Sequence, residues 1–127
     1  IVPGHRPYVT VDGGMGDNIR PALYDAKYET VLATDPRAEL TEHVRIAGKY
    51  CESGDILAED QALPATKSGS LLAMLDTGAY GYSMASNYNR NARPAVVFAE
   101  KGKAQLVIKR ESLEDLVHLD QPYNNED

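Results

Sequence analysis

The feature that most constrains the fold is a succession of short segments in which apolar and polar residues alternate. Residues 28–33 (YETVLA) and 42–47 (EHVRIA) have this period of two, which is typical of strands with one solvent-exposed face. Residues 35–37 (DPR) separate them as a turn. Because such turns recur, and we find neither an internal repeat nor an alternation of strands with helices, the sequence predicts a mainly β fold. We expect a β-barrel or β-sandwich with a few short helices.

Further strands are predicted over residues 8–11, 55–63, 71–75, 94–99 and 104–109. Residues 71–75 (LLAML) are a continuous apolar run, which favours a buried strand. The last two strands are expected to pair as a hairpin around residues 100–103. Ser112, which acidic residues follow, is typical of a helix start, and the polar tail 121–127 is expected to be frayed.

A glycine-rich turn at residues 12–18 (DGGMGDN) precedes a predicted short helix over residues 19–24 (IRPALY). Asp17 or Asn18 can cap this helix, and Pro21 is tolerated in its first turn because the N–H groups there have no helical partner. The turn lacks the Gly-Lys-Ser/Thr ending of a nucleotide-binding loop, and its aspartates would repel phosphate. We therefore expect no nucleotide at this turn.

Length and charge restrict the function classes. The 127 residues suit one domain spanning 1–127, and no apolar run approaches the roughly 20 residues of a membrane helix. The net charge of −6, without a basic stripe, argues against a nucleic-acid partner. The chain begins with IVPG, without methionine or a signal-peptide pattern, so we expect it to be a piece of a longer protein.

The single cysteine cannot form an internal disulfide, which favours a reducing compartment. We expect a cytoplasmic location, or a plastid if the source is a plant. His5, His43 and His118 are isolated and have no metal-ligand spacing with Cys51, so no metal site is expected. Ser53 has no histidine near it in the sequence, so a serine triad has no support.

Cys51 lies among polar residues in the stretch GKYCESGD. A thiol beside the carboxylate of Glu52 can donate a proton as a general acid. Neighbouring residues of a strand point to opposite faces, so the backbone must turn here for both side chains to reach one ligand, and residues 53–55 suit such a turn. The alternative is a packed, inert cysteine followed by a surface loop, since most cysteines outside disulfides are of that kind.

Two further candidates involve tyrosines. Arg20 and Tyr24 are four residues apart, which places both on one face of the predicted helix, where guanidinium and phenol together can hold a carboxylate. The alternative is an amphipathic surface pair. Tyr80, in TGAYG, has small neighbours that would let a ligand approach the backbone, although a tight turn with a packed ring explains the same pattern.

Three longer stretches together resemble one family. They are VDGGMGDNIRPALYDAKYE (residues 11–29), RIAGKYCESGDIL (residues 45–57) and LDTGAYGYSMASNYNRNARPAVV (residues 75–97). In this order and spacing, with RPALY, CESGD and GAYG as the specific motifs, they look like the C-terminal β-domain of the diaminopimelate decarboxylases. These enzymes are pyridoxal-phosphate-dependent decarboxylases of the alanine-racemase-like group. The resemblance covers nearly the whole chain.

The resemblance implies an activity: conversion of meso-2,6-diaminopimelate to L-lysine and CO2, with pyridoxal 5'-phosphate as cofactor. It implies that a (β/α)8 barrel precedes the β-domain and brings the Schiff-base lysine and the phosphate site. We recognise neither in this chain, so we expect the chain alone to be inactive. It further implies an active site at a homodimer interface, so that the cysteine and glutamate of one chain serve the barrel of its partner.

The resemblance also implies roles for single residues. Cys51 corresponds to the catalytic proton donor to the carbon that has lost CO2, and Glu52 to the carboxylate that holds the distal amine of the substrate. Arg20 and Tyr24 correspond to the clamp on the distal carboxylate. Tyr80 corresponds to a tyrosine that contacts both cofactor and substrate.

Two alternatives remain open at this point. One is the β-domain of a sister decarboxylase acting on ornithine, arginine or carboxynorspermidine, whose substrates lack this distal zwitterion or present it differently. The other is a non-catalytic regulatory module that kept the fold. The joint presence of Cys51, Glu52 and Tyr80 argues against such a module, which has no need of all three.

Overall fold

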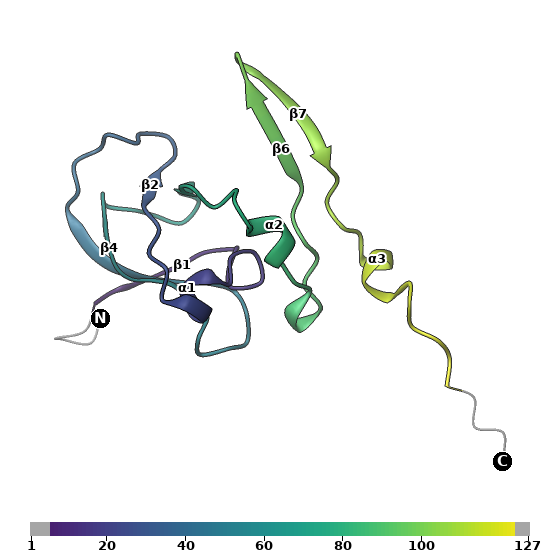
Figure 1. Ribbon diagram of the computed structural model, residues 1–127. Helices are drawn as coiled ribbons and strands as arrows, with labels where there is room; N and C mark the ends of the chain where they lie inside the picture. Colours follow the sequence, from purple (N-terminus) through teal and green to yellow (C-terminus); the bar gives the residue numbers. More distant parts are fainter. Residues whose placement is uncertain (1–5, 124–127) are drawn as a thin grey trace. The chain divides into compact units, whose positions relative to one another are not determined.

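The computed structural model describes residues 6–123, in two compact units (Figure 1). The first unit ends at Ala85 and the second begins at Ser86. The expectation of a single domain over 1–127 stays a prediction. His5, the first residues of the chain and the end of the tail, 124–127, lie outside the described residues.

The described part of the first unit, residues 6–85, contains five strands and two short helices. In chain order they are β1 (Tyr8–Thr10), α1 (Arg20–Tyr24), β2 (Thr30–Leu32), β3 (Glu42–Ala47), β4 (Ile56–Leu63), β5 (Leu72–Met74) and α2 (Gly81–Met84). The predicted strands are therefore confirmed in place, although the segment predicted over residues 28–33 is a strand only at β2.

The core of the first unit lies on a three-stranded sheet in the order β1-β3-β4. β1 runs parallel to β3, and β3 runs antiparallel to β4. Val44 and Ile46 of β3 and Leu63 of β4 are at most 1% exposed, because the alternation of β3 turns every second side chain inward. The sheet thus supplies a small rigid base from which the loops of the first unit extend.

A separate two-stranded antiparallel sheet joins β2 to β5. The prediction of a buried strand over residues 71–75 is wrong as to burial: Leu71 is 63% exposed and the three residues of β5 are only half-buried. The reason is that, among the described residues, β5 lies in a separate two-stranded sheet, and of its three residues Leu72 alone packs against the core of the first unit.

Two details differ from the prediction: α2 was not predicted, and the cap position of α1 lies later in the sequence than Asp17 or Asn18. Residues 76–82 were expected only to interrupt the preceding strand, but Gly81–Met84 form one helical turn. The cap position of α1 is Ile19, which makes no side-chain cap. Asn18 nevertheless accepts the N–H of Arg20 through its Oδ1 at 3.3 Å, whereas Asp17 accepts the N–H of Gly14 instead.

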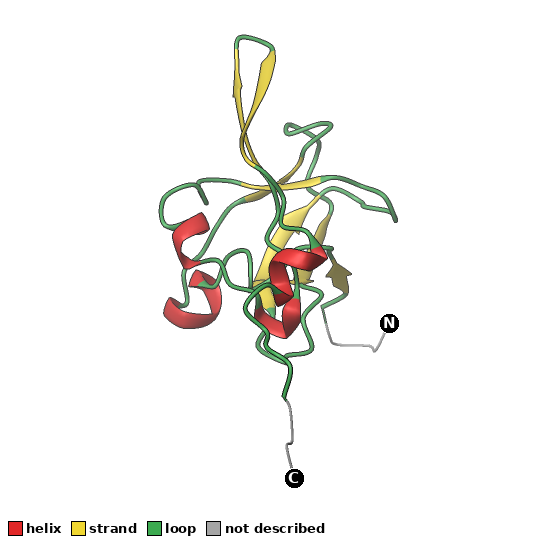
Figure 2. Cartoon of the chain, turned by 90° about the vertical axis from the view of Figure 1, so that its right-hand side faces the viewer, coloured by secondary structure: helices red, strands yellow, loops and turns green. Residues whose placement is uncertain are grey.

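The second unit contains η1 (Tyr88–Arg90), the strands β6 (Val96–Glu100) and β7 (Lys103–Ile108), and α3 (Leu113–Val117). β6 and β7 form the predicted hairpin, seen as the long pair of strands in Figure 2. Lys101 and Gly102 at its tip both have positive φ, as a type I′ turn requires. The predicted start of α3 is also confirmed, because Ser112 and Asp115 form a reciprocal capping box.

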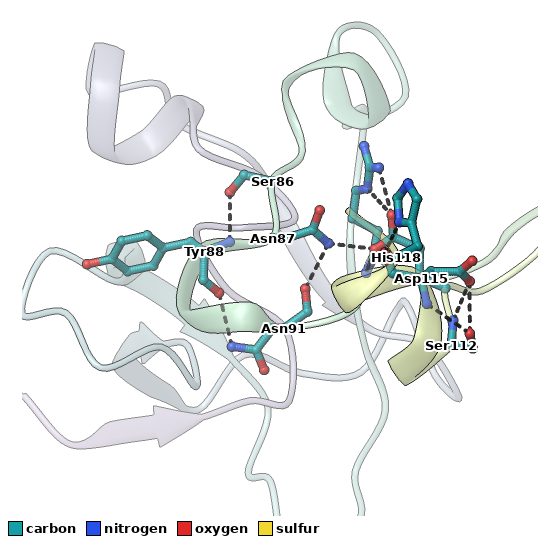
Figure 3. Close-up of polar contacts among 9 residues, drawn as sticks. Ser86, Asn87, Tyr88, Asn91, Ser112, Asp115 and His118 are labelled. Carbon is teal, nitrogen blue, oxygen red and sulfur yellow. Dashed lines mark hydrogen bonds and ion pairs between the residues drawn. The ribbon is translucent and has the colours of Figure 1, made fainter. Parts of the chain in front are cut away.

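Polar contacts of the second unit connect η1 with the segment before α3 (Figure 3). Glu111 accepts two bonds from the guanidinium of Arg93, at 2.9 and 2.7 Å, and one from its backbone N–H at 2.8 Å. The amide of Asn87 donates a further bond to this carboxylate. The Arg93 bonds, with that of Asn87, lower the pKa of Glu111 to about 2. The Glu111 carboxylate therefore joins the segment before α3 to residues 87–93.

The fold class is confirmed as mainly β with a few short helices. Among residues 6–123 the strands pair in three separate sheets and no closed barrel is formed. Nor does any helix of this part of the chain have the length and apolar character needed to cross a membrane.

Candidate functional site

The short helix α1 brings Arg20 and Tyr24 together, as their spacing predicts. The guanidinium carbon of Arg20 lies 5.3 Å from the centre of the Tyr24 ring. Pro21 follows Arg20 in the first turn, where it costs no hydrogen bond. Tyr24 is 60% exposed, so the face that carries this pair is open to a ligand.

Tyr80 reaches the same guanidinium from a distant part of the sequence. Its ring centre lies 5.1 Å from the guanidinium carbon of Arg20, and the side chain is 67% exposed. Its backbone has a φ of 67°, a left-handed conformation that costs a bulky residue about 1–3 kcal/mol. A Cβ added at Gly78 or Gly81 would meet nothing within 4 Å, so the backbone around Tyr80 is accessible.

Arg20 is therefore a half-buried cation that contacts two phenol rings. Its Nη1 also lies 3.9 Å from the sulfur of Met84 in α2. Contact with aromatic faces and a thioether stabilises a guanidinium without neutralising its charge. The group is thus available to pair with an anion, and the nearby phenols can donate further hydrogen bonds.

Cys51 and Glu52 lie on a different loop, between β3 and β4, and both are exposed. The backbone turns here as expected: Glu52 donates its N–H to the carbonyl of Tyr50 at 2.8 Å, and Asp55 donates to the carbonyl of Glu52 at 3.1 Å. The Glu52 carboxylate accepts the N–H of Gly54 at 3.0 Å and the hydroxyl of Ser53 at 3.4 Å. The thiol and the carboxylate are thereby presented on one tight turn at the surface of the first unit.

Next to this exposed turn lies a polar cluster formed by Tyr50, Asp55 and Asp17. Asp55 is 3% exposed and Tyr50 is 7% exposed. Burial raises the pKa of the Tyr50 phenol, and the charges of Asp17 and Asp55 add to the effect. Burial likewise raises the pKa of Asp17, although the backbone N–H of Gly14 opposes that rise. The ionisable groups of the cluster thus face a less polar environment than the exposed turn above them.

The structure brings together three of the five predicted site residues and holds the other two on a separate loop. Arg20, Tyr24 and Tyr80 form one group, and Cys51 and Glu52 form the other. From the sequence, Met84 has no predicted role, and Asp55 is predicted only as part of the turn over residues 53–55 and of the strand that follows it. Asp55 could have been noticed as the last residue of the CESGD motif, whereas nothing in the sequence marks Met84. No set of side chains suited to a metal ion occurs among residues 6–123.

The chain is similar to a group of decarboxylases. The family model described as "Pyridoxal-dependent decarboxylase, C-terminal sheet domain" matches residues 2–78. Diaminopimelate decarboxylase of Bacillus subtilis is 62% identical over 122 residues, which are 96% of this chain and 28% of that protein. The chain therefore spans little more than a quarter of that relative.

Two solved structures of diaminopimelate decarboxylases are also similar to this chain. Diaminopimelate decarboxylase of M. jannaschii, in complex with L-lysine, superposes with a TM-score of 0.83 at 39% identity, covering 91% of this chain and 26% of that one. The Helicobacter pylori enzyme, also complexed with L-lysine, has a TM-score of 0.80 at 39% identity, covering 88% of this chain and 27% of that one.

Proposed function

This chain belongs to the pyridoxal-dependent decarboxylases, as their C-terminal sheet domain, and on that premise we propose that it is part of a diaminopimelate decarboxylase. The whole protein then converts meso-2,6-diaminopimelate to L-lysine and CO2, the last step of lysine biosynthesis. The observation that carries this proposal is the contact of the Arg20 guanidinium with the rings of Tyr24 and Tyr80, in a unit that also presents the exposed Cys51–Glu52 turn.

The chemistry of the substrate fits this pair of groups. Diaminopimelate carries an amino-acid head at each end, so the end that does not react is a zwitterion. Recognition of a zwitterion requires a cation for the carboxylate and an anion for the ammonium group. Arg20, with Tyr24, supplies the first, and Glu52 supplies the second. A substrate without the distal carboxylate leaves the guanidinium without its anion, which costs about 1–3 kcal/mol or more.

Cys51 is the proton donor in this proposal. Bound pyridoxal phosphate supplies an electron sink when the substrate carboxylate leaves as CO2. The carbon that has lost the carboxylate then takes a proton from the Cys51 thiol, and the neighbouring Glu52 holds the far end of the same molecule in place. The exposed turn allows both side chains to enter a site that another part of the protein completes.

Tyr80 is the residue of this chain that fits a contact with the cofactor. Its phenol is 67% exposed, and open space surrounds the glycines on either side, so a planar ring can approach it. We assign the Schiff-base lysine and the phosphate site to a preceding (β/α)8 barrel. The strained backbone of Tyr80 is consistent with a position that is kept for contact with a ligand.

We further propose that the protein is a homodimer whose active site lies at the subunit interface, where Cys51 and Glu52 serve the barrel of the partner. We also propose a cytoplasmic location, which agrees with a single cysteine and a biosynthetic reaction. In this arrangement the 127-residue chain alone, given pyridoxal phosphate, releases no CO2 from diaminopimelate.

The test is a substrate panel with the full-length protein and its Arg20→Lys variant. The parent is expected to prefer diaminopimelate to ornithine, arginine and carboxynorspermidine. Lysine keeps the charge but loses the planar fork and its contact with two rings, so the KM for diaminopimelate should rise about tenfold or more. Arg37→Lys, at an exposed turn, is the matched control and should leave the KM unchanged. Preference for ornithine in the parent, or an unchanged KM in Arg20→Lys, contradicts the proposal.

A further inference from the structure

Asp55 differs from the other residues of its motif in being buried. Cys51, Glu52, Ser53 and Gly54 are exposed, whereas Asp55 is 3% exposed. A carboxylate is costly to remove from water unless hydrogen bonds replace its hydration. The position of Asp55 is therefore stable only through the groups that contact its two oxygen atoms.

Both oxygen atoms accept backbone N–H groups, and these come from two different loops. Oδ1 accepts the N–H of Met15 at 2.7 Å, and Oδ2 accepts the N–H of Tyr50 at 2.8 Å. Hydrogen bonds to an ionised carboxylate are shorter and stronger than neutral ones. One side chain thus joins loop 12–18 to the turn that begins at Tyr50, across 40 positions of the sequence.

The two loops are packed so closely that glycine is required between them. A Cβ at Gly14 would lie 2.7 and 2.8 Å from the two carboxylate oxygens of Asp55 and would also collide with the Tyr50 ring. A Cβ at Gly48 would collide with the Asp55 carboxylate itself. A backbone hydrogen bond, in which Lys49 donates its N–H to the Gly13 carbonyl at 3.0 Å, joins the same two loops. Two of the three glycines of loop 12–18, which do not fit a nucleotide site, are thereby explained: Gly14 leaves space for Asp55 and Tyr50, and Gly16 leaves space for Tyr50.

Each of the joined loops leads directly to one group of site residues. Loop 12–18 runs into α1, which begins at Arg20, and the turn after Tyr50 carries Cys51 and Glu52. We propose that Asp55 is a positioning residue for the decarboxylation, which holds the Cys51–Glu52 turn in its reactive place by anchoring it to loop 12–18. This inference rests on the proposed function. It assigns to Asp55 no contact with the substrate.

The first test is Asp55→Asn in the full-length enzyme. Asparagine has the same shape but keeps only one accepting oxygen, so one of the two loops must lose its bond. We expect kcat to fall about ten- to a hundredfold, because small displacements of a reacting group have effects of that size. The visible absorption of bound pyridoxal phosphate should be unchanged. The rate at which iodoacetamide alkylates Cys51, followed by peptide mass spectrometry, should change, because the thiol moves relative to Glu52.

A second variant displaces the same contact without removing a hydrogen-bonding group. Gly14→Ala inserts a methyl group against the Tyr50 ring and the Asp55 oxygens, which forces the same two loops apart, and we expect kcat to fall as in Asp55→Asn. Gly13→Ala is the matched control, since its Cβ would meet only an Asp17 oxygen, at 3.3 Å. Its kcat should stay within about twofold of the parent. If Asp55→Asn does not fold, Gly14→Ala decides the matter.

Two outcomes overturn the inference. One is a folded, cofactor-loaded Asp55→Asn or Gly14→Ala enzyme with the kcat of the parent. The other is an unchanged alkylation rate at Cys51 in these variants. Failure of the parent to release CO2 from diaminopimelate would instead contradict the proposed function, and the alkylation rates would still test whether Asp55 holds the turn.

Discussion

Arg20, whose guanidinium we propose as a carboxylate-binding group, contacts two aromatic rings and a thioether, none of which carries a negative charge. Its guanidinium lies 5.3 and 5.1 Å from the centres of the Tyr24 and Tyr80 rings. Each ring contributes about 0.5–1 kcal/mol at an exposed position, which orients the cation but does not neutralise it. The left-handed backbone of Tyr80 opposes this gain by a similar amount. The arrangement is therefore close to neutral for stability, which is what we expect of a group kept for binding.

The proposed role of the Cys51 thiol as proton donor predicts the effect of replacing this residue. Cys51→Ala in the full-length enzyme removes the proposed proton donor without adding volume at an exposed position. We expect kcat to fall about a hundred- to ten-thousandfold, the usual range for loss of a general acid. Pyridoxal phosphate should stay bound, because the proposal places most of its contacts in the barrel. Steady-state CO2 release and visible absorption measure the two effects.

Ser53→Ala is the matched control in the same turn. It removes the 3.4 Å bond to Glu52 but leaves the thiol and the backbone bond from Gly54 in place. Its kcat should stay close to that of the parent. An unchanged kcat in Cys51→Ala would point to another proton donor and to the regulatory alternative for this domain.

At the scale of elements, strands were predictable because their signal is local. The alternation of residues 42–47 coincides with β3, and the hairpin tip at Lys101 and Gly102 carries residues that suit positive φ. The capping box of Ser112 and Asp115 likewise depends on residues three positions apart. In each case the residues that determine the structure are near neighbours in the sequence.

The errors concern features set by distant contacts. The burial of β5 depends on what packs against its two faces, and no pattern in residues 71–75 indicates that Leu72 alone of this strand reaches the core of the first unit. The turn α2 follows a left-handed Tyr80, a conformation that its neighbours do not require. Of the site, the pairing of Arg20 with Tyr24 follows from spacing, whereas the approach of Tyr80 and the link from Asp55 to Met15 join segments far apart.

Glu111 gives a prediction for the second unit. Its pKa is lowered from 4.5 to about 2, chiefly by hydrogen bonds from Arg93. A carboxylate with a lowered pKa in the folded state contributes stability above its unfolded pKa and loses it as the pH falls toward the folded value. The stability difference between parent and Glu111→Gln should therefore be greatest above about pH 4.5 and shrink toward pH 2.

Thermal unfolding of both proteins across this range measures the difference, and NMR titration of the Glu111 carboxyl gives its midpoint directly. Glu114→Gln, an exposed acid in the first turn of α3, controls for removal of a charge. A Glu111 midpoint near 4.5, or a stability difference that does not vary with pH, would contradict the proposed role of Arg93.

At the scale of the whole molecule, the chain spans 28% of the length of its Bacillus subtilis relative. Its proposed site residues either pair with one another or lie on an exposed turn, which is the arrangement expected when another domain supplies the reacting group. Exposed apolar residues occur in both units, Leu23 at 59% and Phe98 at 66% among them. Such surface is consistent with contacts to a barrel and to a second subunit.

A dimer in which each chain lends Cys51 and Glu52 to its partner predicts complementation between inactive variants. Cys51→Ala enzyme is mixed with enzyme that lacks the Schiff-base lysine of the barrel, and subunits are exchanged. Half of the dimers are then hybrids in which one of two sites has both residues intact, so about a quarter of the parent activity should return. A mixture of Cys51→Ala and Glu52→Gln enzymes is the control, because every site then contains one altered residue and no activity should return. If the first mixture stays inactive although hybrid dimers are detected by native mass spectrometry, each chain uses its own Cys51, and the shared site is excluded.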